Sequence, residues 1–248
     1  MGKAEKLKEQ RKIERIQKVL NKERRFKIFG FVLLGIAAGA LLGTGIFFGT
    51  SYIKNNFFNK AKAVAKVKSY KTSSRTYSQA PDMQIDTSKT YVAKFETNDG
   101  NFEITLDAKD APKTVNNFVV LAKDGYYDGL TFHRIVKDFM IQGGDPLGNG
   151  SGGPGYKFDD EKVVGDYTPG TVAMANSGAN TNGSQFFIMT GDYSGGKLPK
   201  SYTIFGNVTS GMDVVNKINI TPTVDNGQGE QSKPTTTVLI NKVTIEEN

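Results

Sequence analysis

The sequence predicts a mainly β domain that forms one closed barrel with helices over its openings, preceded by a single transmembrane helix. Short strand-like runs recur from residue 82 onward between turn residues, whereas only two stretches there have helical character. Many short strands and two helices in a region of this length are typical of one closed barrel. Residues 28–53 contain no charged residue, which is typical of a transmembrane helix.

A β-hairpin and a helix are expected at the start of the domain. Residues 91–97 and 101–106 alternate between apolar and polar side chains around an Asn-Asp-Gly turn at 98–100, which is a strong hairpin signal. Residues 110–123 are expected to be helical, because Asp-Ala-Pro is a typical helix start and Gly125 is a typical helix stop.

The remainder of the domain is predicted to be mostly strand. A second helix is expected near residues 212–218, with Ser210 as its N-cap. Further short strands are expected at 130–136, 139–142, 171–175, 185–189, 202–208 and 237–245.

The charge-free segment 28–53 is long enough to cross a bilayer, since a helical span needs about 20 apolar residues. Gly35, Gly39 and Gly43 recur within it at four-residue spacing, which would allow two such helices to approach closely. A weak homodimer through these glycines is therefore one hypothesis. The alternative to a permanent anchor is a secretion signal that is cleaved after the apolar run.

Basic residues are concentrated on both sides of the apolar segment. Residues 1–29 carry 11 Lys/Arg and 4 Asp/Glu, residues 54–75 carry 7 Lys/Arg and no acidic residue, and residues 82–248 carry 14 Lys/Arg and 21 Asp/Glu. The larger N-terminal excess predicts a basic cytoplasmic tail at 1–27 and an external C-terminal domain, joined to the anchor by a basic linker at 54–81. The acidic domain lacks the electrostatic footprint of a nucleic-acid-binding protein.

Two stretches contain the candidate site. Residues 132–146 read F-H-R-I-V-K-D-F-M-I-Q-G-G-D-P, and residues 174–187 read M-A-N-S-G-A-N-T-N-G-S-Q-F-F. They supply one cation, Arg134, two carboxamides and several large apolar side chains, but no nucleophile with a base and no metal cage. The chain has no cysteine, which excludes thiolate catalysis and zinc–sulfur sites. This set suits binding and straining an uncharged polymer better than cutting one.

The strand pattern is expected to bring part of this set together. If the first stretch forms a hairpin, Arg134 lies one strand away from Met140 and Gln142, which share a face. Gln185 and Phe187 share a face of another strand in the same way. Arginine, glutamine and phenylalanine side chains from separate strands are therefore expected to line one surface of the barrel.

These segments resemble the cyclophilin family of peptidyl-prolyl cis-trans isomerases, with matches running from about residue 90 to residue 245. The motifs F-H-R-x-x-x-x-F-M-x-Q-G-G-D and M-A-N-x-G-x-N-T-N-G-S-Q-F-F are long and specific. The resemblance implies an eight-stranded antiparallel barrel capped by two helices, and an isomerase domain over residues 82–248. It also implies rotation about X-Pro peptide bonds as the reaction, which requires no cofactor and no metal.

The resemblance also assigns roles to individual residues. It implies that Arg134 is the catalytic arginine, and that Gln142 and the backbone of Asn176 hydrogen-bond the substrate. The remaining matches are the proline pocket, on Phe139, Met140, Phe187 and Leu198, and the groove around it, on Ala175, Gln185 and Tyr202.

Two positions depart from the family pattern. Tyr202 stands where other members often carry histidine, and Lys197 stands where many members carry tryptophan. The chain contains no tryptophan at all. Since cyclosporin binding by the family depends on that tryptophan, weakened inhibition is predicted.

The single histidine and the glycine-rich connection have simpler interpretations than catalysis. Neighbouring residues on a strand face opposite ways, so His133 is expected to point away from Arg134 and to pack or hydrogen-bond structurally. The glycines of residues 143–155 are interpreted as turns, because the lysine and following helix of a phosphate-binding loop are missing.

The combined prediction is a membrane-anchored prolyl isomerase at the outer surface of the cell membrane. Its expected partners are proline-containing unfolded or nascent exported polypeptides, and the membrane itself through residues 28–53. The alternative function is a non-catalytic chaperone or scaffold that binds proline peptides in the same groove. The alternative location is outside the cell in secreted form, after cleavage of the apolar segment.

Overall fold

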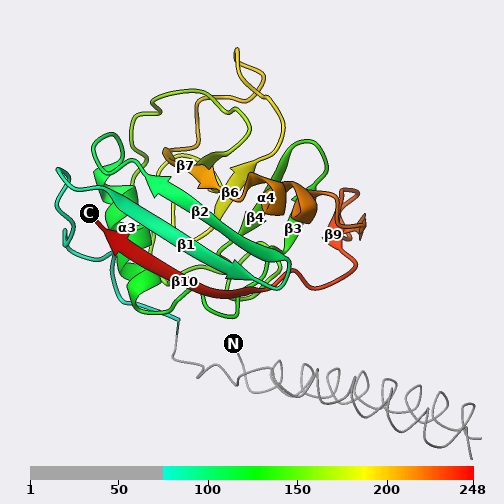
Figure 1. Cartoon of the computed structure of the whole chain (residues 1–248), viewed down its shortest axis with the longest axis horizontal. Helices are drawn as coiled ribbons and strands as arrows, with labels where there is room; N and C mark the ends of the chain where they lie inside the picture. The colour runs from blue at the N-terminus through cyan, green and yellow to red at the C-terminus, as the bar shows by residue number, and fades with distance from the viewer. Residues whose placement is uncertain (1–74) are drawn as a thin grey trace, which may run out of the picture. The chain divides into compact units, whose positions relative to one another are not determined.

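The computed structural model describes residues 75–248 of the chain (Figure 1). The predicted tail at 1–27, the anchor at 28–53 and most of the linker at 54–81 lie outside these residues. Within 75–248, no helix has the length and apolar character needed to cross a bilayer. The membrane anchor and its orientation therefore stay predictions.

Eight antiparallel strands form one curled sheet, in the order β10-β1-β2-β7-β5-β6-β4-β3. The predicted first hairpin is confirmed, because β1 pairs with β2 from Tyr91 opposite Leu106 to Thr97 opposite Gly100. The strands are β1 Tyr91–Thr97, β2 Gly100–Leu106, β3 Arg134–Val136, β4 Met140–Gly143, β5 Thr171–Met174, β6 Phe186–Met189, β7 Ile204–Ser210 and β10 Ile240–Glu247.

The sheet is open, so the prediction of a closed barrel was wrong. Strands β10 and β3 are its two ends and do not pair with each other. The chain before β3 meets the start of β10, through the isolated bridge between Thr131 and Leu239 and a hydrogen bond from Ile240 N–H to the carbonyl of Leu130 at 2.8 Å. Strand β3 has three residues, and the turn that follows places Asp138 at a φ of 58°. In the main sheet β3 pairs with β4 alone, so the ladder does not close and the sheet forms a curled half-barrel.

Both predicted helices are present, α3 at Pro112–Lys123 and α4 at Met212–Asn219. Their predicted N-caps were wrong, since neither Asp110 nor Ser210 occupies the cap position and neither cap makes a side-chain hydrogen bond. A carboxylate distant in the sequence accepts hydrogen bonds from the N-terminus of α3 instead. The carboxylate of Glu161 accepts hydrogen bonds from the first turn of that helix, including one from Thr114 N–H at 2.8 Å.

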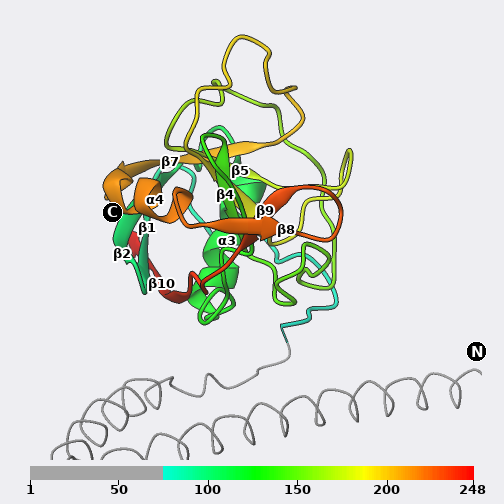
Figure 2. The same ribbon diagram turned by 90° about the vertical axis from the view of Figure 1, so that its right-hand side faces the viewer.

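A second, two-stranded sheet was not predicted. It consists of β8, Thr223–Asp225, and β9, Gln231–Pro234, which pair antiparallel as a hairpin (Figure 2). Its residues are polar and mostly exposed, so they show little of the apolar alternation that identifies a strand. Strand β9 contacts β3, which places this hairpin beside the open end of the main sheet.

Aromatic side chains fill the space between the sheet and α3. The rings of Phe95 and Phe102 stack across β1 and β2 with centroids 4.6 Å apart. Phe118 of α3 packs edge-on against Phe186 of β6 with centroids 5.7 Å apart. Burial alternates along β1 and β2, because every second side chain of a strand points toward this core.

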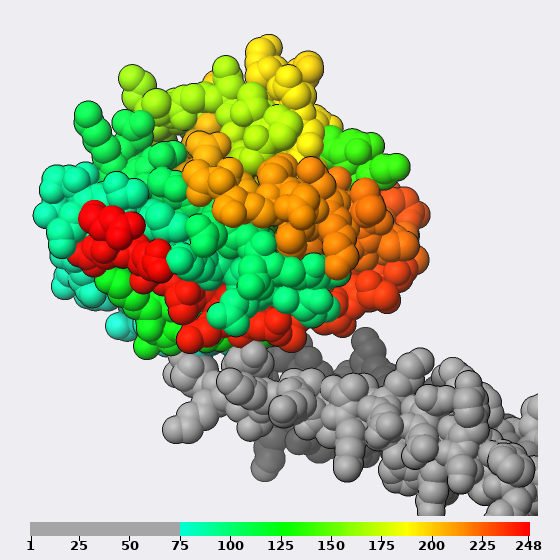
Figure 3. Space-filling model, viewed as in Figure 1, coloured from blue at the N-terminus to red at the C-terminus, as the bar shows by residue number. Residues whose placement is uncertain are grey.

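The outer faces of β1, β2 and β10 are mostly polar. In the space-filling view the C-terminal strand lies beside the first hairpin on one face of the molecule (Figure 3), in agreement with the pairing of β10 with β1. Lys94 on this face lies 2.6 Å from Glu246 of β10 and 3.6 Å from Glu103 of β2. These pairs are solvent-exposed, so each contributes little to stability.

Candidate active site

Three neighbouring strands bring Arg134, Gln142 and Phe187 into one row. Arg134 on β3 lies opposite Gln142 on β4, and Gln142 lies opposite Phe187 on β6. Side chains of directly opposite residues project from the same face of a sheet. The predicted convergence of these three side chains on one surface is confirmed.

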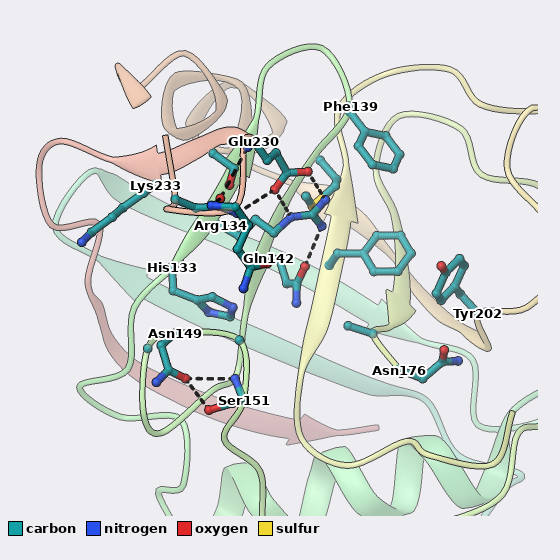
Figure 4. Close-up of a pocket in the computed structure, with 18 of the residues that line it drawn as sticks. His133, Arg134, Phe139, Gln142, Asn149, Ser151, Asn176, Tyr202, Glu230 and Lys233 are labelled. Atoms are coloured by element: carbon teal, nitrogen blue, oxygen red, sulfur yellow. Dashed lines mark hydrogen bonds and ion pairs between the residues drawn. The ribbon is translucent and has the colours of Figure 1, made fainter. Parts of the chain in front are cut away.

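This row forms part of a groove with a volume of about 840 Å³. Strands β3, β4 and β6 contribute to one side of it, and the hairpin β8–β9 contributes Glu230 and its neighbours to the other (Figure 4). Every predicted site residue except Gln185 lines this groove, namely Arg134, Phe139, Met140, Gln142, Ala175, Asn176, Phe187, Leu198 and Tyr202.

One end of the groove is apolar. Phe187 and Met140 are almost fully buried beneath it, and the ring of Tyr202 packs edge-on against Phe187 with centroids 5.5 Å apart. Phe139 packs against Tyr193 with centroids 4.5 Å apart. Tyr193 had not been identified from the sequence, because it lies in a glycine-rich turn outside both motifs. Phe139, Met140, Phe187 and Tyr202 line this end of the groove and make a preformed apolar seat.

A chain of hydrogen bonds orients the polar residues. Arg134 Nη1 donates to Gln142 Oε1 at 2.9 Å, and Gln142 Nε2 donates to Gln185 Oε1 at 2.9 Å. Gln185 Nε2 in turn donates to the carbonyls of Gly150 and Gly152 at 3.0 and 2.8 Å. Gln185 was predicted to be a groove residue, but it lies behind Gln142 and lines an adjacent hollow. Its observed contacts hold the carboxamide of Gln142 in one orientation.

Asn176 leaves its backbone available at the edge of the groove. Its side-chain Nδ2 donates to the carbonyl of Ser201 at 2.8 Å, which fixes the loop position. Among residues 75–248, neither the N–H nor the C=O of Asn176 has a hydrogen-bond partner. Two exposed peptide groups beside an apolar seat can pair with the backbone of an extended peptide.

The connection between the two motifs forms the wall near His133. Asp145 is buried and accepts N–H bonds from Leu147, Asn149 and Gly150 at 2.7, 3.0 and 2.6 Å. Burial alone would raise the pKa of this carboxyl, but the three N–H donors lower it. The glycine-rich residues are turns, as predicted, and Asp145 keeps them folded.

Glu230 is a charged residue of the site that sequence reasoning also missed. Its Oε2 accepts from Arg134 Nε at 2.7 Å and its Oε1 accepts from Arg134 Nη2 at 2.6 Å. These bonds from Arg134 lower the pKa of the Glu230 carboxyl to about 2. Glu230 lies 96 residues after Arg134 in a polar stretch, where nothing in the local pattern separates it from a solvated surface acid.

His133 was expected to point away from Arg134 and to pack or hydrogen-bond structurally, and it also lines the groove. Figure 4 shows its ring between Gln142 and the loop of Asn149, directed away from the guanidinium of Arg134. Both ring nitrogens are buried, and neither has a hydrogen-bond partner among the described residues. The side chain therefore packs rather than hydrogen-bonds, and no serine is placed to pair with it as a nucleophile.

His133 is expected to make stability depend on pH. Burial lowers the pKa of His133 below its usual value near 6.5. Below that pH the unfolded chain binds a proton that the folded chain does not, so the free energy of unfolding falls as the pH drops, by at most about 1.4 kcal/mol per pH unit. The fall continues until the pH reaches the lowered pKa of the folded state.

Thermal unfolding of the wild type and of a His133→Gln variant at pH 7.5 and pH 5.0 checks this prediction. Because His133 is the only histidine, the variant should lose less melting temperature between the two pH values than the wild type. Carboxyl groups titrate mainly below this window and affect both proteins alike. An equal loss in both proteins would contradict the prediction.

The fold and the site define a class of protein before any comparison. A curled antiparallel sheet carries an open groove with an apolar seat, free backbone groups and a guanidinium held by hydrogen bonds. These features are typical of a domain that binds extended peptide and acts on it without a covalent step. A family model described as cyclophilin type peptidyl-prolyl cis-trans isomerase/CLD matches residues 92–245. The chain belongs to this family.

Curated relatives and a solved structure agree with this result. The chain is 44% identical over 173 residues to peptidyl-prolyl cis-trans isomerase B of Streptomyces anulatus, covering 62% of this chain and 95% of that protein. It is 44% identical over 134 residues to a peptidyl-prolyl cis-trans isomerase of Helicobacter pylori, covering 52% of this chain and 81% of that protein.

The solved structure is a cyclophilin type peptidyl-prolyl cis-trans isomerase of Cryptosporidium parvum, crystallised in the presence of the dipeptide Ala-Pro. It aligns with a TM-score of 0.57 and 34% identity, covering 63% of this chain and 99% of that one. The predicted reaction, rotation about X-Pro peptide bonds, is confirmed at the level of the family.

Weakened inhibition by cyclosporin stays a prediction, and it concerns one position of the rim. Lys197 is exposed in a turn in which its N–H approaches the carbonyl of Ser194 at 3.4 Å, whereas the next residue, Leu198, lines the groove. No indole is available there to cover the bound inhibitor. We expect an inhibition constant at least about 10-fold weaker than that of a tryptophan-bearing relative, since an aromatic contact contributes about 1 kcal/mol beyond its buried area.

Inhibition curves for the wild type and a Lys197→Trp variant measure this effect. The variant should gain affinity for cyclosporin while its uninhibited rate stays near that of the wild type. Equally tight inhibition of the wild type and a tryptophan-bearing relative would show that the position is unimportant.

Proposed function

We propose that Arg134 catalyses the rotation by donating a hydrogen bond to the prolyl nitrogen, while Phe139, Met140, Phe187 and Leu198 seat the proline ring. The observation that supports this most directly is the row of Arg134, Gln142 and Phe187 on adjacent strands. It places a permanent cation two strands away from Phe187 of the apolar seat, with Gln142 between them. A proline in that seat presents its nitrogen toward the guanidinium.

The reaction itself explains why such a site needs no nucleophile. Rotation about the C–N bond faces a barrier of about 18–20 kcal/mol because resonance is lost as the bond twists. The twist returns a lone pair to the prolyl nitrogen, which can then accept a hydrogen bond. An arginine donor therefore stabilises the twisted transition state more than either planar ground state, and only such differential binding accelerates the step.

The magnitudes show what the rest of the groove must supply. An acceleration of about 10⁵-fold requires roughly 7 kcal/mol. One well-placed donor supplies about 3–4 kcal/mol. The remainder comes from holding the ring in the seat while Gln142 and the free backbone of Asn176 hold the other side of the bond, and from excluding water.

The proposed substrates are proline-containing unfolded or nascent exported polypeptides at the outer surface of the cell membrane. The uncharged segment 28–53 and the basic excess of residues 1–29 support an uncleaved anchor with the N-terminus inside. The open groove suits extended chains better than folded ones, because its free peptide groups need an unpaired partner backbone.

Exchange spectroscopy by NMR on a short X-Pro peptide separates catalysis from mere binding. A small amount of the full-length chain in a mild detergent should produce exchange cross-peaks between the cis and trans proline signals within a second. A non-catalytic scaffold would shift or broaden the peptide signals at higher protein concentration without exchange between them, and that result would favour the scaffold.

Protease treatment of intact cells tests the proposed location. If the domain is external and anchored, added protease should remove it from whole cells, and it should sediment with membranes before treatment. A domain protected until the cells are lysed would contradict the orientation. A domain recovered in the medium without its apolar segment would support the secreted form.

A further inference from the structure

The hairpin β8–β9 places a carboxylate on the proposed catalytic cation. The two oxygens of Glu230 bind the Nε and Nη2 edge of Arg134 at 2.7 and 2.6 Å, which is the bidentate arrangement of an arginine–carboxylate pair (Figure 4). Gln142 engages Nη1 from the other side at 2.9 Å. The guanidinium is thus held at both ends, by two elements that are distant in the sequence.

The loop that carries Glu230 is itself braced. The carbonyl of Glu230 accepts from Asn226 N–H at 2.9 Å, and the carboxylate of Asp225 accepts from Gly227 N–H at 2.6 Å. The Ser232 side chain, two residues after Glu230, is buried. Hydrogen bonds within the loop fix its backbone, so the carboxylate of Glu230 is restrained and can in turn restrain Arg134. On a flexible loop the carboxylate would move together with the arginine side chain.

Enough of the guanidinium stays free for a substrate. Arginine has five N–H donors, and Glu230 and Gln142 engage three of them through oxygen. The sulfur of Met140 lies 4.0 Å from Nη1 and is a weak acceptor. The Nη groups therefore keep donors for a prolyl nitrogen while the Nε edge is occupied.

We propose that Glu230 is a positioning residue of the isomerase, which holds the guanidinium of Arg134 in the orientation that meets the twisted prolyl nitrogen. The proposal rests on the proposed role of Arg134. It extends the site beyond the two sequence motifs and makes the hairpin β8–β9 part of the catalytic apparatus. The reaction involves no bond cleavage at Glu230, and its carboxylate stays ionised throughout.

Two opposing effects decide the sign of this contribution. The negative charge of Glu230 weakens the field of the guanidinium in the groove, which would slow the reaction. The side chains of Arg134 and Glu230 are 34% and 38% exposed, so water screens that charge over the distance to the substrate. The two hydrogen bonds act at contact and remove the rotamer freedom of a long side chain, so restraint prevails.

A double-mutant cycle on the full-length chain tests the proposal with Glu230→Gln, Arg134→Ala and the double variant. Glu230→Gln keeps the side-chain shape but removes the charge and one of the two acceptor oxygens. We expect kcat/KM to fall about 10-fold, the effect of freeing one long side chain, mostly through kcat. In the Arg134→Ala background, the same substitution should change kcat/KM less than twofold.

Glu246→Gln is the matched control, because Glu246 is an exposed glutamate of β10 that pairs with Lys94 away from the groove. It should leave kcat and KM unchanged. Glu230→Asp keeps the charge on a shorter stem and should recover part of the lost kcat. All variants should melt within a few degrees of the wild type, which separates lost positioning from lost folding.

Each outcome has a distinct meaning. Unchanged or raised activity in Glu230→Gln, with Arg134→Ala still impaired, would overturn the positioning role and leave the catalytic role of Arg134 intact. An equal loss from Glu230→Gln with and without Arg134 would show that Glu230 acts on the fold alone. Full activity in Arg134→Ala would overturn the proposed catalytic arginine itself.

The Arg134 Nε–H signal in a ¹⁵N NMR spectrum provides a direct readout of the contact. In the wild type it should be sharp at neutral pH, because Glu230 protects this proton from exchange with water. In Glu230→Gln it should broaden or vanish, whereas Glu246→Gln should leave it unchanged. A sharp signal in Glu230→Gln would contradict the proposal.

Discussion

Replacing Arg134 with alanine is expected to lower kcat/KM for an X-Pro peptide by roughly 10²–10³-fold, the usual loss on removing one transition-state donor. The residual rate should stay above that of the free peptide, because the apolar seat and Gln142 still hold both sides of the bond. The loss should fall mainly on kcat, since the prolyl nitrogen accepts a hydrogen bond only in the twisted state. A protease-coupled assay on the full-length chain measures both parameters.

Two further variants sharpen this test. Arg134→Lys keeps the charge but cannot bond Glu230 through two edges and the substrate at once, so it should lose most of the activity as well. Lys242→Ala removes an exposed cation of β10 and should have no effect. If Arg134→Lys retained most of the rate, catalysis would depend on the positive charge rather than on the geometry of the guanidinium N–H donors.

Replacing Phe118 with alanine is expected to cost about 3–5 kcal/mol of unfolding free energy, the range for truncating a buried phenylalanine. Phe118 of α3 is 1% exposed, and its ring centroid lies 4.8 Å from that of Tyr127 and 5.4 Å from that of Phe205. No neighbouring side chain can fill the space, because α3 and the sheet are both held by other contacts. Domains of this kind are stable by about 5–15 kcal/mol, so a large part of the total would be lost.

Urea unfolding followed by the near-ultraviolet circular dichroism of the tyrosines measures this effect. The chain has 10 tyrosines and no tryptophan, so the signal reports tyrosine packing around the core. The midpoint should shift strongly with little change in slope. Ile220→Ala, at a position that is 67% exposed, should change the free energy of unfolding by no more than about 0.5 kcal/mol. Similar shifts for both variants would mean that Phe118 does not organise the core.

Local patterns predicted most of the elements correctly. The hairpin formed by β1 and β2 depends on an Asn-Asp-Gly turn and on alternation, both of which act within a few residues. The positions of α3 and α4 likewise depend on short-range signals. The row of Arg134, Gln142 and Phe187 followed from alternation combined with the motif resemblance, because a strand fixes which residues share a face.

Errors in the prediction arose where distant segments meet. Whether the sheet closes depends on how far β3 extends beside β10, and no pattern within either strand specifies that contact. The first turn of α3 is bonded by Glu161, which lies 48 residues from Lys113 and accepts a hydrogen bond from its N–H at 3.0 Å. From the sequence, Glu161 cannot be distinguished from an acidic residue on the solvent-exposed surface.

The sequence was sufficient for the class of fold, the reaction and nine of the groove-lining residues, because periodicity indicates the strands and the resemblance to a known family implies the rest. The open sheet, the position of Gln185 behind Gln142, and Glu230 on the guanidinium emerged only from the folded domain. Their contacts join segments tens of residues apart, and the packing of polar hairpins carries no local signal. Glu230, which is expected to orient the guanidinium of Arg134, is thus brought to that side chain only by the tertiary fold.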